Sequence, residues 1–170
     1  MTSTTTNDPL LARAKALKLH GLLAHWEEVA GAAWIEPLIQ WEEAERARRS
    51  LERRLGSAHL GRFRPLADFD WDWPKRCDRE ALEELMGLAF LQETANAILV
   101  GPNGVGKSTI ARNIAHQAVL AGHTVLGTSA AQMLNELAAA VGDNALRRRL
   151  AFYTRPRLLL VDEIGYLSYS

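Results

Sequence analysis

The chain has 170 residues, of which 48% are apolar, which is enough for one ordinary core and a small helical appendage. Its 20 basic residues balance its 20 acidic residues, so the net charge indicates neither an acidic nor a basic partner. The single cysteine, Cys77, excludes an internal disulfide and is typical of a reducing compartment. No apolar run approaches the roughly 20 residues that span a bilayer, and the polar start MTSTTTNDP is unlike a signal peptide. We therefore expect a cytoplasmic protein without a membrane partner.

The charged residues are distributed unevenly along the chain. Seven arginines but only one acidic residue, Glu52, lie at positions 46–64, whereas seven acidic and three basic residues lie at positions 68–84. Such a change from basic to acidic indicates a boundary near Pro65. The expected parts are a helical N-terminal domain at residues 1–64, a linker with a leading helix at 65–95, and an α/β core at 96–170.

The N-terminal part is predicted to be helical. Asp8 is a good N-cap and Pro9 a good first helical residue, and apolar residues then recur at helical spacing to about Val29. A second helix is expected from about Pro37, with its arginines mainly on one face. A third helix is expected to begin with Asp78 as its cap.

The five tryptophans are numerous for this length. Helical spacing predicts that Trp34 and Trp41 belong to the core of the N-terminal helices. Trp71 and Trp73 lie in the irregular run FDWDWP, where docking against the α/β core is favoured over stacking on nucleic-acid bases.

Strands and helices are predicted to alternate from residue 97 on. The short apolar runs AILV (97–100) and RLLLV (157–161) have the pattern of buried parallel strands. Between them we expect a helix at 107–120, a strand at 124–127, a helix capped by Ser129 and a helix capped by Asp143. This order predicts a parallel α/β sheet.

A glycine-rich motif follows the first predicted strand. Gly101, Gly106, Lys107 and Ser108 match the pattern GxxxxGK[ST]. Glycines let the backbone curl so that successive N–H groups point at one anion, and the next helix adds its positive N terminus. Lys107 would then reach the β- and γ-phosphates, and the Ser108 hydroxyl would bind Mg²⁺. A glycine turn without a ligand is the alternative. The candidate nucleotide-binding residues are Gly101, Pro102, Asn103, Gly104, Val105, Gly106, Lys107, Ser108 and Thr109.

Two carboxylates follow the last predicted strand. Open α/β sheets bind ligands at the carboxyl ends of their strands, and the run LLLVDE places Asp162 and Glu163 there. Asp162 would hold Mg²⁺, mostly through water, and Glu163 could polarise the attacking water as a general base. The candidate catalytic residues are thus Lys107, Asp162 and Glu163, and the candidate metal ligands are Ser108 and Asp162. An acidic strand end that faces solvent is the alternative.

The run NAILVGPNGVGKSTIARNIA (96–115), together with VDEIGYL (161–167), resembles the IstB-like ATPases. These are AAA+ helper proteins of bacterial insertion sequences and relatives of the DnaC helicase loader. The resemblance extends to LKLHGLLAHWEE, the arginine-rich helix and DFDWDWP, so it covers nearly the whole chain. It implies a P-loop AAA+ core at 96–170 that binds ATP with Mg²⁺, forms a homo-oligomer on duplex DNA and stimulates a partner transposase. It also places Asn96 near the nucleotide.

The chain departs from this family after Glu163. The family's sheet has the strand order 5-1-4-3-2, and its fourth strand, arginine finger and helical lid cannot be assigned here. Without the fourth strand, the AILV and LLLV strands lack a direct neighbour in the middle of the sheet. Each buried backbone group left unsatisfied costs about 1–3 kcal/mol. We therefore expect a truncated or split copy that alone hydrolyses ATP poorly or not at all.

Two arginine clusters are candidates for contact with DNA phosphates. The alternative is a solvated helix face with internal pairs such as Glu45 with Arg49. The candidate residues are Arg46, Arg48, Arg49, Arg53, Arg54, Arg147, Arg148 and Arg149.

Other functions compete with that of a transposition helper. A replicative helicase loader of the same superfamily would bind a helicase instead of a transposase. A catalytically incomplete ATP-binding fragment would act as a binding module for full-length copies. A small-metabolite kinase is less favoured, because no acceptor-binding lid is visible.

Overall fold

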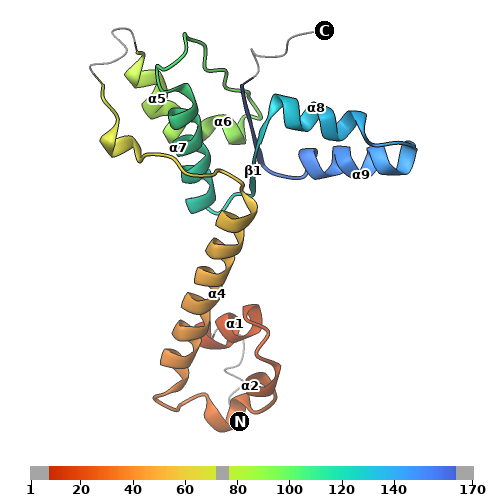
Figure 1. Ribbon diagram of the computed structural model, residues 1–170. Helices are drawn as coiled ribbons and strands as arrows, with labels where there is room; N and C mark the ends of the chain where they lie inside the picture. Colours follow the sequence, from red (N-terminus) through yellow and green to blue (C-terminus); the bar gives the residue numbers. More distant parts are fainter. Residues whose placement is uncertain (1–7, 72–76, 164–170) are drawn as a thin grey trace. The chain divides into compact units, whose positions relative to one another are not determined.

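The computed structural model describes residues 8–71 and 77–163 (Figure 1). The chain divides into two compact units, Met1–Ser50 and Leu51–Ser170. The described part of the first unit is entirely helical, and the second combines helices with a parallel sheet. The predicted fold class, an α/β core preceded by helices, is confirmed.

The N-terminal unit begins with a carboxylate that has two structural roles. Its helices are α1 (Pro9–Ala16), α2 (His20–Ala24), α3 (Trp26–Val29) and the first part of α4 (Ile35–Ser57). As predicted, Asp8 caps α1: its Oδ1 accepts a hydrogen bond of 2.9 Å from the backbone N–H of Leu10. Its Oδ2 accepts a 3.2 Å bond from the indole of Trp26, which is buried in the core of this unit. One side chain therefore starts a helix and fixes the core tryptophan.

The prediction of one helix to Val29 was wrong, because the chain turns after Ala16. Lys18 has φ 53°, a left-handed conformation that glycine usually takes. The N–H of Leu19 bonds to the carbonyl of Ala14 and that of Lys18 to Lys15, which is the hydrogen-bond pattern of a Schellman motif. Three short helices result.

The prediction that Trp34 and Trp41 are core residues was also wrong. They are 51% and 70% exposed, respectively. Ile35 and Ile39, one helical turn apart, are fully buried instead. Since Trp26 already fills this small core, α4 presents its isoleucines to the core and leaves the two other indoles at the surface.

The sheet of the second unit has two described strands. β1 (Val125–Ser129) and β2 (Leu158–Asp162) are parallel, and their register pairs Val125 with Leu158 and Ser129 with Asp162. The other edge of β1 is also paired, because the N–H of Gly127 donates a 2.7 Å bond to the carbonyl of Ala58.

The predicted strand at 97–100 is not formed. Ile98 is 80% and Val100 89% exposed, and only Leu99 packs against the core. A short apolar segment becomes a strand only when a neighbour completes its ladder. Within the described residues, β1 is paired on both edges and no strand lies beside 97–100. The predicted gap is therefore present at this segment, but the prediction that the LLLV strand lacks a direct neighbour was wrong, because β2 pairs with β1.

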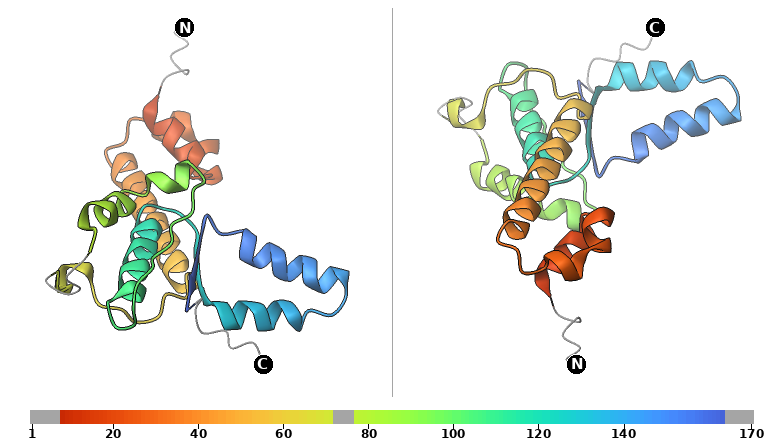
Figure 2. Two further views of the ribbon diagram at one scale, coloured as in Figure 1. Left: turned by 90° about the horizontal axis from the view of Figure 1, so that it is seen from above. Right: turned by 90° about the horizontal axis from the view of Figure 1, so that it is seen from below.

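Helix α7 (Lys107–Leu120) is the centre of the core of the second unit. Its buried residues include Ile110, Ile114 and Val119. They pack with leucines of the flanking elements, which are η1 (Leu66–Asp68), α5 (Arg79–Met86) and α6 (Ala89–Gln92). Figure 2 shows α7 beside the sheet from two further directions.

The segment before α5 docks on this core, as predicted for Trp71. Its ring meets that of Phe69 edge to face at a centroid distance of 5.0 Å, and the guanidinium of Arg79 lies 4.8 Å from its centroid. Asp78 caps α5 through a 3.0 Å bond from the N–H of Ala81, also as predicted. Trp73 lies outside the described residues.

Helices α8 (Ala130–Ala138) and α9 (Asp143–Thr154) form a hairpin that connects the two strands and lies to one side of the sheet (Figure 1). Ser129 caps α8 as predicted, by accepting a 3.1 Å bond from the N–H of Gln132. The prediction that Asp143 caps α9 was wrong: Gly142, with φ 85°, is the N-cap, and Asp143 lies in the first turn. Glu136 joins the two helices by accepting bonds from the hydroxyl of Tyr153 at 2.7 Å and from Arg149 at 3.0 Å.

Candidate nucleotide-binding site

The glycine-rich loop at residues 101–106 leads directly into α7. Gly104 and Gly106 have φ values of 81° and 90°, which favour glycine. The first helical hydrogen bond runs from the N–H of Ile110 to the carbonyl of Gly106. The N–H groups of the first turn of α7 therefore have no partner within the helix and can bind an anion.

Gly106 is required for a second reason, which is its contact with Phe69. A Cβ atom at position 106 would lie 2.5 Å from Cε2 of Phe69, closer than real Cβ contacts. The aromatic ring therefore lies directly against the loop backbone. Sequence reasoning missed Phe69, because this contact joins residues that are 37 positions apart and depends on the tertiary fold.

Lys107 folds back over the start of the loop. Its Nζ donates hydrogen bonds to the carbonyls of Gly101 at 2.8 Å and Pro102 at 2.7 Å. The ammonium group is thus at the mouth of the loop, where an anion held by the N–H groups of α7 would meet it.

The structure brings Ser108 and Asp162 together across 54 residues of sequence. The hydroxyl of Ser108 donates a 3.0 Å hydrogen bond to Oδ1 of Asp162, at the carboxyl end of β2. Asp162 is half-buried, whereas Glu163 is exposed, with φ 62° and its N–H bonded to Oδ1 of Asp162. The two carboxylates therefore lie in different environments, one facing the loop and the other facing solvent.

Arg112 also contacts this carboxylate, and sequence reasoning did not identify it. Its Nη2 lies 3.5 Å from Oδ2 of Asp162, and its Nη1 donates a 3.3 Å bond to the carbonyl of Arg62. It lies one turn after Ser108 on α7, so both residues reach the end of β2 from the same helix face. The helical spacing of four residues was the available signal.

The chain between α4 and α5 lies along α7 over residues Ala58–Phe69, which we call the connecting segment. Asn113, a buried polar residue, accepts a 3.0 Å bond from the N–H of Leu66 and donates a 2.9 Å bond to the carbonyl of Arg64. The segment therefore runs from the edge of β1, at Ala58, to the phosphate loop, at Phe69.

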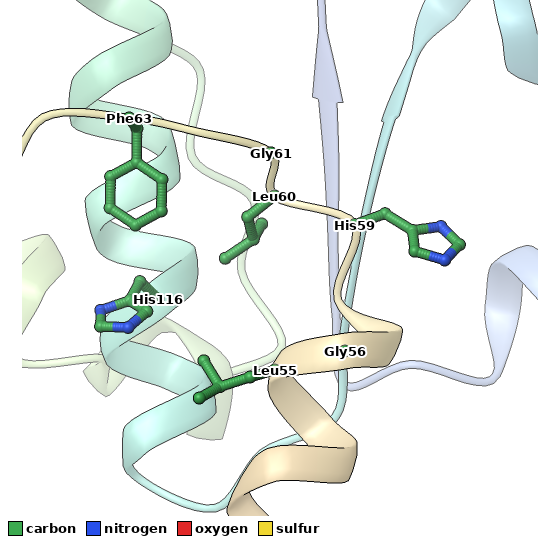
Figure 3. Close-up of a pocket in the computed structure, with 7 residues that line it drawn as sticks. All are labelled: Leu55, Gly56, His59, Leu60, Gly61, Phe63 and His116. Atoms are coloured by element: carbon green, nitrogen blue, oxygen red, sulfur yellow. The ribbon is translucent and has the colours of Figure 1, made fainter.

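A pocket of about 350 Å³ lies beside the connecting segment, away from the loop. Figure 3 shows its lining, in which the rings of Phe63 and His116 meet edge to face, with centroids 5.5 Å apart, and His59 points away from His116. None of the predicted site residues lines this pocket. Among the described residues, no group of three or more His, Cys, Asp or Glu side chains is placed to hold a metal ion.

The arginines of α4 differ in their surroundings. The pair predicted between Glu45 and Arg49 is present at 2.7 Å, and Glu45 also pairs with Arg48. These two guanidiniums lower the pKa of Glu45 to about 2. Arg46 pairs with Glu42 at 3.3 Å. Arg54 is half-buried and donates a 3.2 Å bond to the carbonyl of Val119 near the C-terminal end of α7.

The chain is a P-loop nucleotide-binding protein of the α/β class. Three features define this class: the glycine-rich loop, the helix N terminus that follows it, and the carboxylate at the end of a parallel strand. The family described as IstB-like ATP binding protein matches residues 11–170, and the chain belongs to this family. The predicted resemblance is confirmed.

Individual relatives carry names that refer to insertion sequences. The chain is 40% identical, over 78% of its length, to a protein of Pseudomonas aeruginosa named for ATP binding in insertion sequence IS21. It is 28% identical over 77% of its length to the similarly named protein of IS5376 from Geobacillus stearothermophilus. It is 29% identical over 96% of its length to an insertion-sequence protein named for ATP binding in Mycobacterium tuberculosis. The matches cover 50%, 52% and 69% of these relatives, so the chain spans about half the length of the first two. Among the described residues, no helix is both long enough and apolar enough to cross a membrane.

Proposed function

We propose that the chain binds ATP with Mg²⁺ at the phosphate loop and acts in the transposition of an insertion sequence. The observation that carries the proposal is the 3.0 Å contact between Ser108 and Asp162, because it places the helix that follows the loop against the acidic end of β2. An isolated glycine turn would not require a carboxylate at this position. The membership in a family named for ATP binding supports the same ligand.

The donor atoms at this contact fit Mg²⁺. The ion prefers oxygen ligands and usually keeps several waters, with one or two protein ligands beside the phosphates. The hydroxyl oxygen of Ser108 and the carboxylate oxygen of Asp162 are donors of this kind, and they lie 3.0 Å apart. Ser108 and Asp162 would hold the ion, which would neutralise phosphate charge.

The residues around the ion have distinct proposed roles. Lys107 exchanges its two carbonyl acceptors for oxygens of the β- and γ-phosphates, and the N–H groups of α7 bind the same anion. Glu163 orients the attacking water. The contacts of Arg112 are with Asp162 and with the carbonyl of Arg62, so we assign it the role of positioning Asp162.

Turnover by this chain alone is proposed to be slow. The segment at 97–100, which leads into the phosphate loop, has no strand beside it among the described residues, and Glu163 is exposed. A general base needs a fixed position relative to its water. ATP binding and ATP hydrolysis are therefore to be measured separately, by equilibrium titration and by phosphate release.

Titration with a fluorescent ATP analogue tests the binding proposal. Lys107→Ala should weaken binding about 10- to 100-fold, because hydrogen bonds to charged groups contribute about 1.5–3 kcal/mol. Lys15→Ala removes an exposed lysine of α1 and is the matched control, with no expected change. Equal affinity of wild type and Lys107→Ala would contradict the proposal.

We also propose that the chain contacts duplex DNA and a transposase as part of a homo-oligomer in the cytoplasm. The exposed arginines of α4 and of the α8–α9 hairpin support contact with DNA phosphates. Arg54 and Arg149 bond to other helices of the second unit, and Arg48 bonds to Glu45 through two nitrogens. Arg46 and Arg49 each donate one bond to a glutamate of α4, which a phosphate could replace. The proposed DNA contacts are therefore Arg46, Arg49, Arg53, Arg147 and Arg148.

The salt dependence of DNA binding tests this assignment. Each phosphate contact contributes about 0.9 to the slope of log affinity against log salt concentration. Arg147→Ala combined with Arg148→Ala should reduce the magnitude of the slope by about 1.8, which is the contribution of two phosphate contacts. Arg155→Ala, beyond the end of α9, is the control. An unchanged slope in the double variant would remove the hairpin from the DNA contact.

A further inference from the structure

The pocket beside the connecting segment is a cavity for which ATP binding gives no role. Its volume of about 350 Å³ lies near the lower end of the range for small-ligand sites, which is about 300–1,000 Å³. Leu55, Leu60 and Phe63 give it apolar walls, and His116 adds a ring with two nitrogens (Figure 3). None of the described residues that line it is acidic. The pocket can therefore hold one small ring system and does not repel an anion beside it.

The wall formed by residues 58–60 is fixed by contacts of its backbone. Ala58 and Leu60 are buried, and the carbonyl of Ala58 accepts the 2.7 Å bond from the N–H of Gly127 in β1. The carbonyl of His59 is also close to β1, since a Cβ atom at position 127 would lie 3.0 Å from it. The pocket is therefore formed by the fold before any ligand binds, as is usual for binding sites.

Phe63 and His116 present aromatic surface to this pocket. Their rings meet at an interplanar angle of 62°. In such an edge-to-face pair, the ring that contributes its edge keeps both faces uncovered by its partner. No hydrogen bond engages the ring nitrogens of His116 within the described part of the chain. The pair therefore offers what a nucleobase needs, which is a ring to stack on and polar atoms that can bond to its edge.

Two arginines flank Phe63 in the connecting segment. Arg62 and Arg64 are exposed, whereas Phe63 between them is half-buried. Their backbone carbonyls hold the segment in place: that of Arg62 accepts a bond from Arg112. That of Arg64 accepts a bond from Asn113. Neither guanidinium has an ion pair or a hydrogen bond with another described residue. Both are therefore available to bind phosphate.

We infer that this pocket binds an unpaired base of DNA, while Arg62 and Arg64 hold the phosphates on its two sides. The apolar walls take the ring and the arginines take the charge, as in other sites for single strands. A duplex cannot enter a cavity of this size, so the base must leave its stack. A free nucleotide has the same chemistry. Arginines on both sides of the aromatic residue favour a strand, in which each base has a phosphate before and after it.

This inference rests on the proposed contact with DNA and adds a site to it. The arginines of α4 and of the hairpin were proposed to bind the phosphates of a duplex, which requires no pocket. The residues at this pocket would instead distinguish an unpaired base from a paired one. The two kinds of binding can therefore be measured separately.

Fluorescence anisotropy of labelled oligothymidylate with the full chain tests the role of the ring. Phe63→Leu keeps an apolar side chain against the core and removes the ring, so it should lower the affinity about tenfold or more. Phe63→Tyr keeps a ring and should bind like the wild type. Urea denaturation shows whether both variants remain folded. An affinity that Phe63→Leu leaves unchanged would overturn the inference.

The two arginines have a signature of their own. Each phosphate contact with a single strand contributes about 0.7 to the slope of log affinity against log salt concentration. Arg62→Ala combined with Arg64→Ala should therefore reduce the magnitude of the slope by about 1.4. The backbone carbonyls that hold the segment remain in this variant. Lys15→Ala combined with Arg155→Ala removes two exposed charges elsewhere and is the matched control. A slope equal to that of the control would also overturn the inference.

A duplex with one unpaired 2-aminopurine tests whether the base enters the pocket. The fluorescence of 2-aminopurine depends on its stacking, so the wild type should change it and Phe63→Leu should not. Both proteins should bind a fully paired duplex equally. Thymidine monophosphate that competes as well as the oligonucleotide would assign the pocket to free nucleotides and overturn the choice of DNA.

The paired duplex separates this inference from the proposed function. If the wild type binds the paired duplex, and Phe63→Leu has no effect on unpaired bases, the contact with DNA stands and the pocket inference is wrong. If the wild type binds neither kind of DNA, both are wrong. If Phe63→Leu weakens only the binding of unpaired bases, both are supported.

Discussion

The hydroxyl of Ser108 donates a 3.0 Å hydrogen bond to Oδ1 of Asp162, so that the loop side and the strand side of the candidate site are in direct contact. Ser108→Ala removes one proposed metal ligand and leaves the loop backbone in place. We expect the gain in ATP affinity on adding Mg²⁺ to fall at least about tenfold, while affinity without Mg²⁺ changes little. Titrations at several Mg²⁺ concentrations measure both. Ser57→Ala, at the end of α4, is the matched control.

Arg112 is predicted to act on the position of Asp162. The pair is 35% and 22% exposed at its side chains, so solvent reduces its contribution, and Arg112→Ala should lower the free energy of unfolding by about 0.5–1 kcal/mol. Urea denaturation measures this loss. The affinity for Mg²⁺ should change as well, whereas the affinity for ATP without Mg²⁺ should not. A change in metal-free affinity as large as that of Lys107→Ala would show that Arg112 binds phosphate directly.

The contact between Gly106 and Phe69 predicts two separable costs for Gly106→Ala. The new methyl group meets the ring at 2.5 Å, and φ 90° is unfavourable for alanine. We expect a loss of about 1–3 kcal/mol in unfolding free energy together with weakened ATP binding. Combining it with Phe69→Ala should remove the clash but leave the backbone strain. A double-mutant cycle should therefore show a coupling of about 1 kcal/mol or more. Strict additivity would contradict the contact.

The bond between Tyr153 and Glu136 predicts a pH-dependent stability of the α8–α9 hairpin. Hydrogen bonds from Gln132 and then Tyr153 lower the pKa of Glu136 below its ordinary 4.5, so its contribution is present above that pH and is lost as the pH falls. Burial, followed by the bond to Glu136, raises the pKa of Tyr153 above its ordinary 10.0, so its contribution is lost as the pH rises through the raised value.

Tyr153→Phe should therefore destabilise the chain most between about pH 5 and 10 and less on either side. Thermal unfolding at a series of pH values measures the difference from wild type. Leu150→Ala changes an exposed apolar residue of the same helix, and its effect should be independent of pH. A pH-independent difference for Tyr153→Phe would mean that only packing is lost.

The local features of the site could be predicted from sequence, because local chemistry determines them. The glycine-rich loop, the cap at Ser129 and the carboxylate after a buried strand each depend on a few adjacent residues. Lys18 could not be predicted at a left-handed position, because the hydrogen bonds of the turn override the usual preference for glycine. Periodicity assigned Trp41 to the core, since it cannot distinguish which of two apolar faces is buried.

The contacts of Arg112, Asn113 and Phe69 depend on the tertiary fold. Each joins residues at least 37 positions apart, and no local pattern reports such distances. The apolar run at 97–100 shows the converse, because it has the sequence pattern of a buried strand and yet forms no strand. A strand forms only beside another strand, and the composition of a segment does not show whether such a strand is present.

The connecting segment Ala58–Phe69 has a consequence for how this protein can change in evolution. Loops ordinarily accept insertions and deletions. This one is attached at short intervals, through Ala58 at the sheet edge, Asn113 on α7 and Phe69 at the loop. One added residue would put the wrong backbone group opposite Asn113 and move the aromatic ring off Gly106. The number of residues in this connection is therefore constrained like that of a core helix.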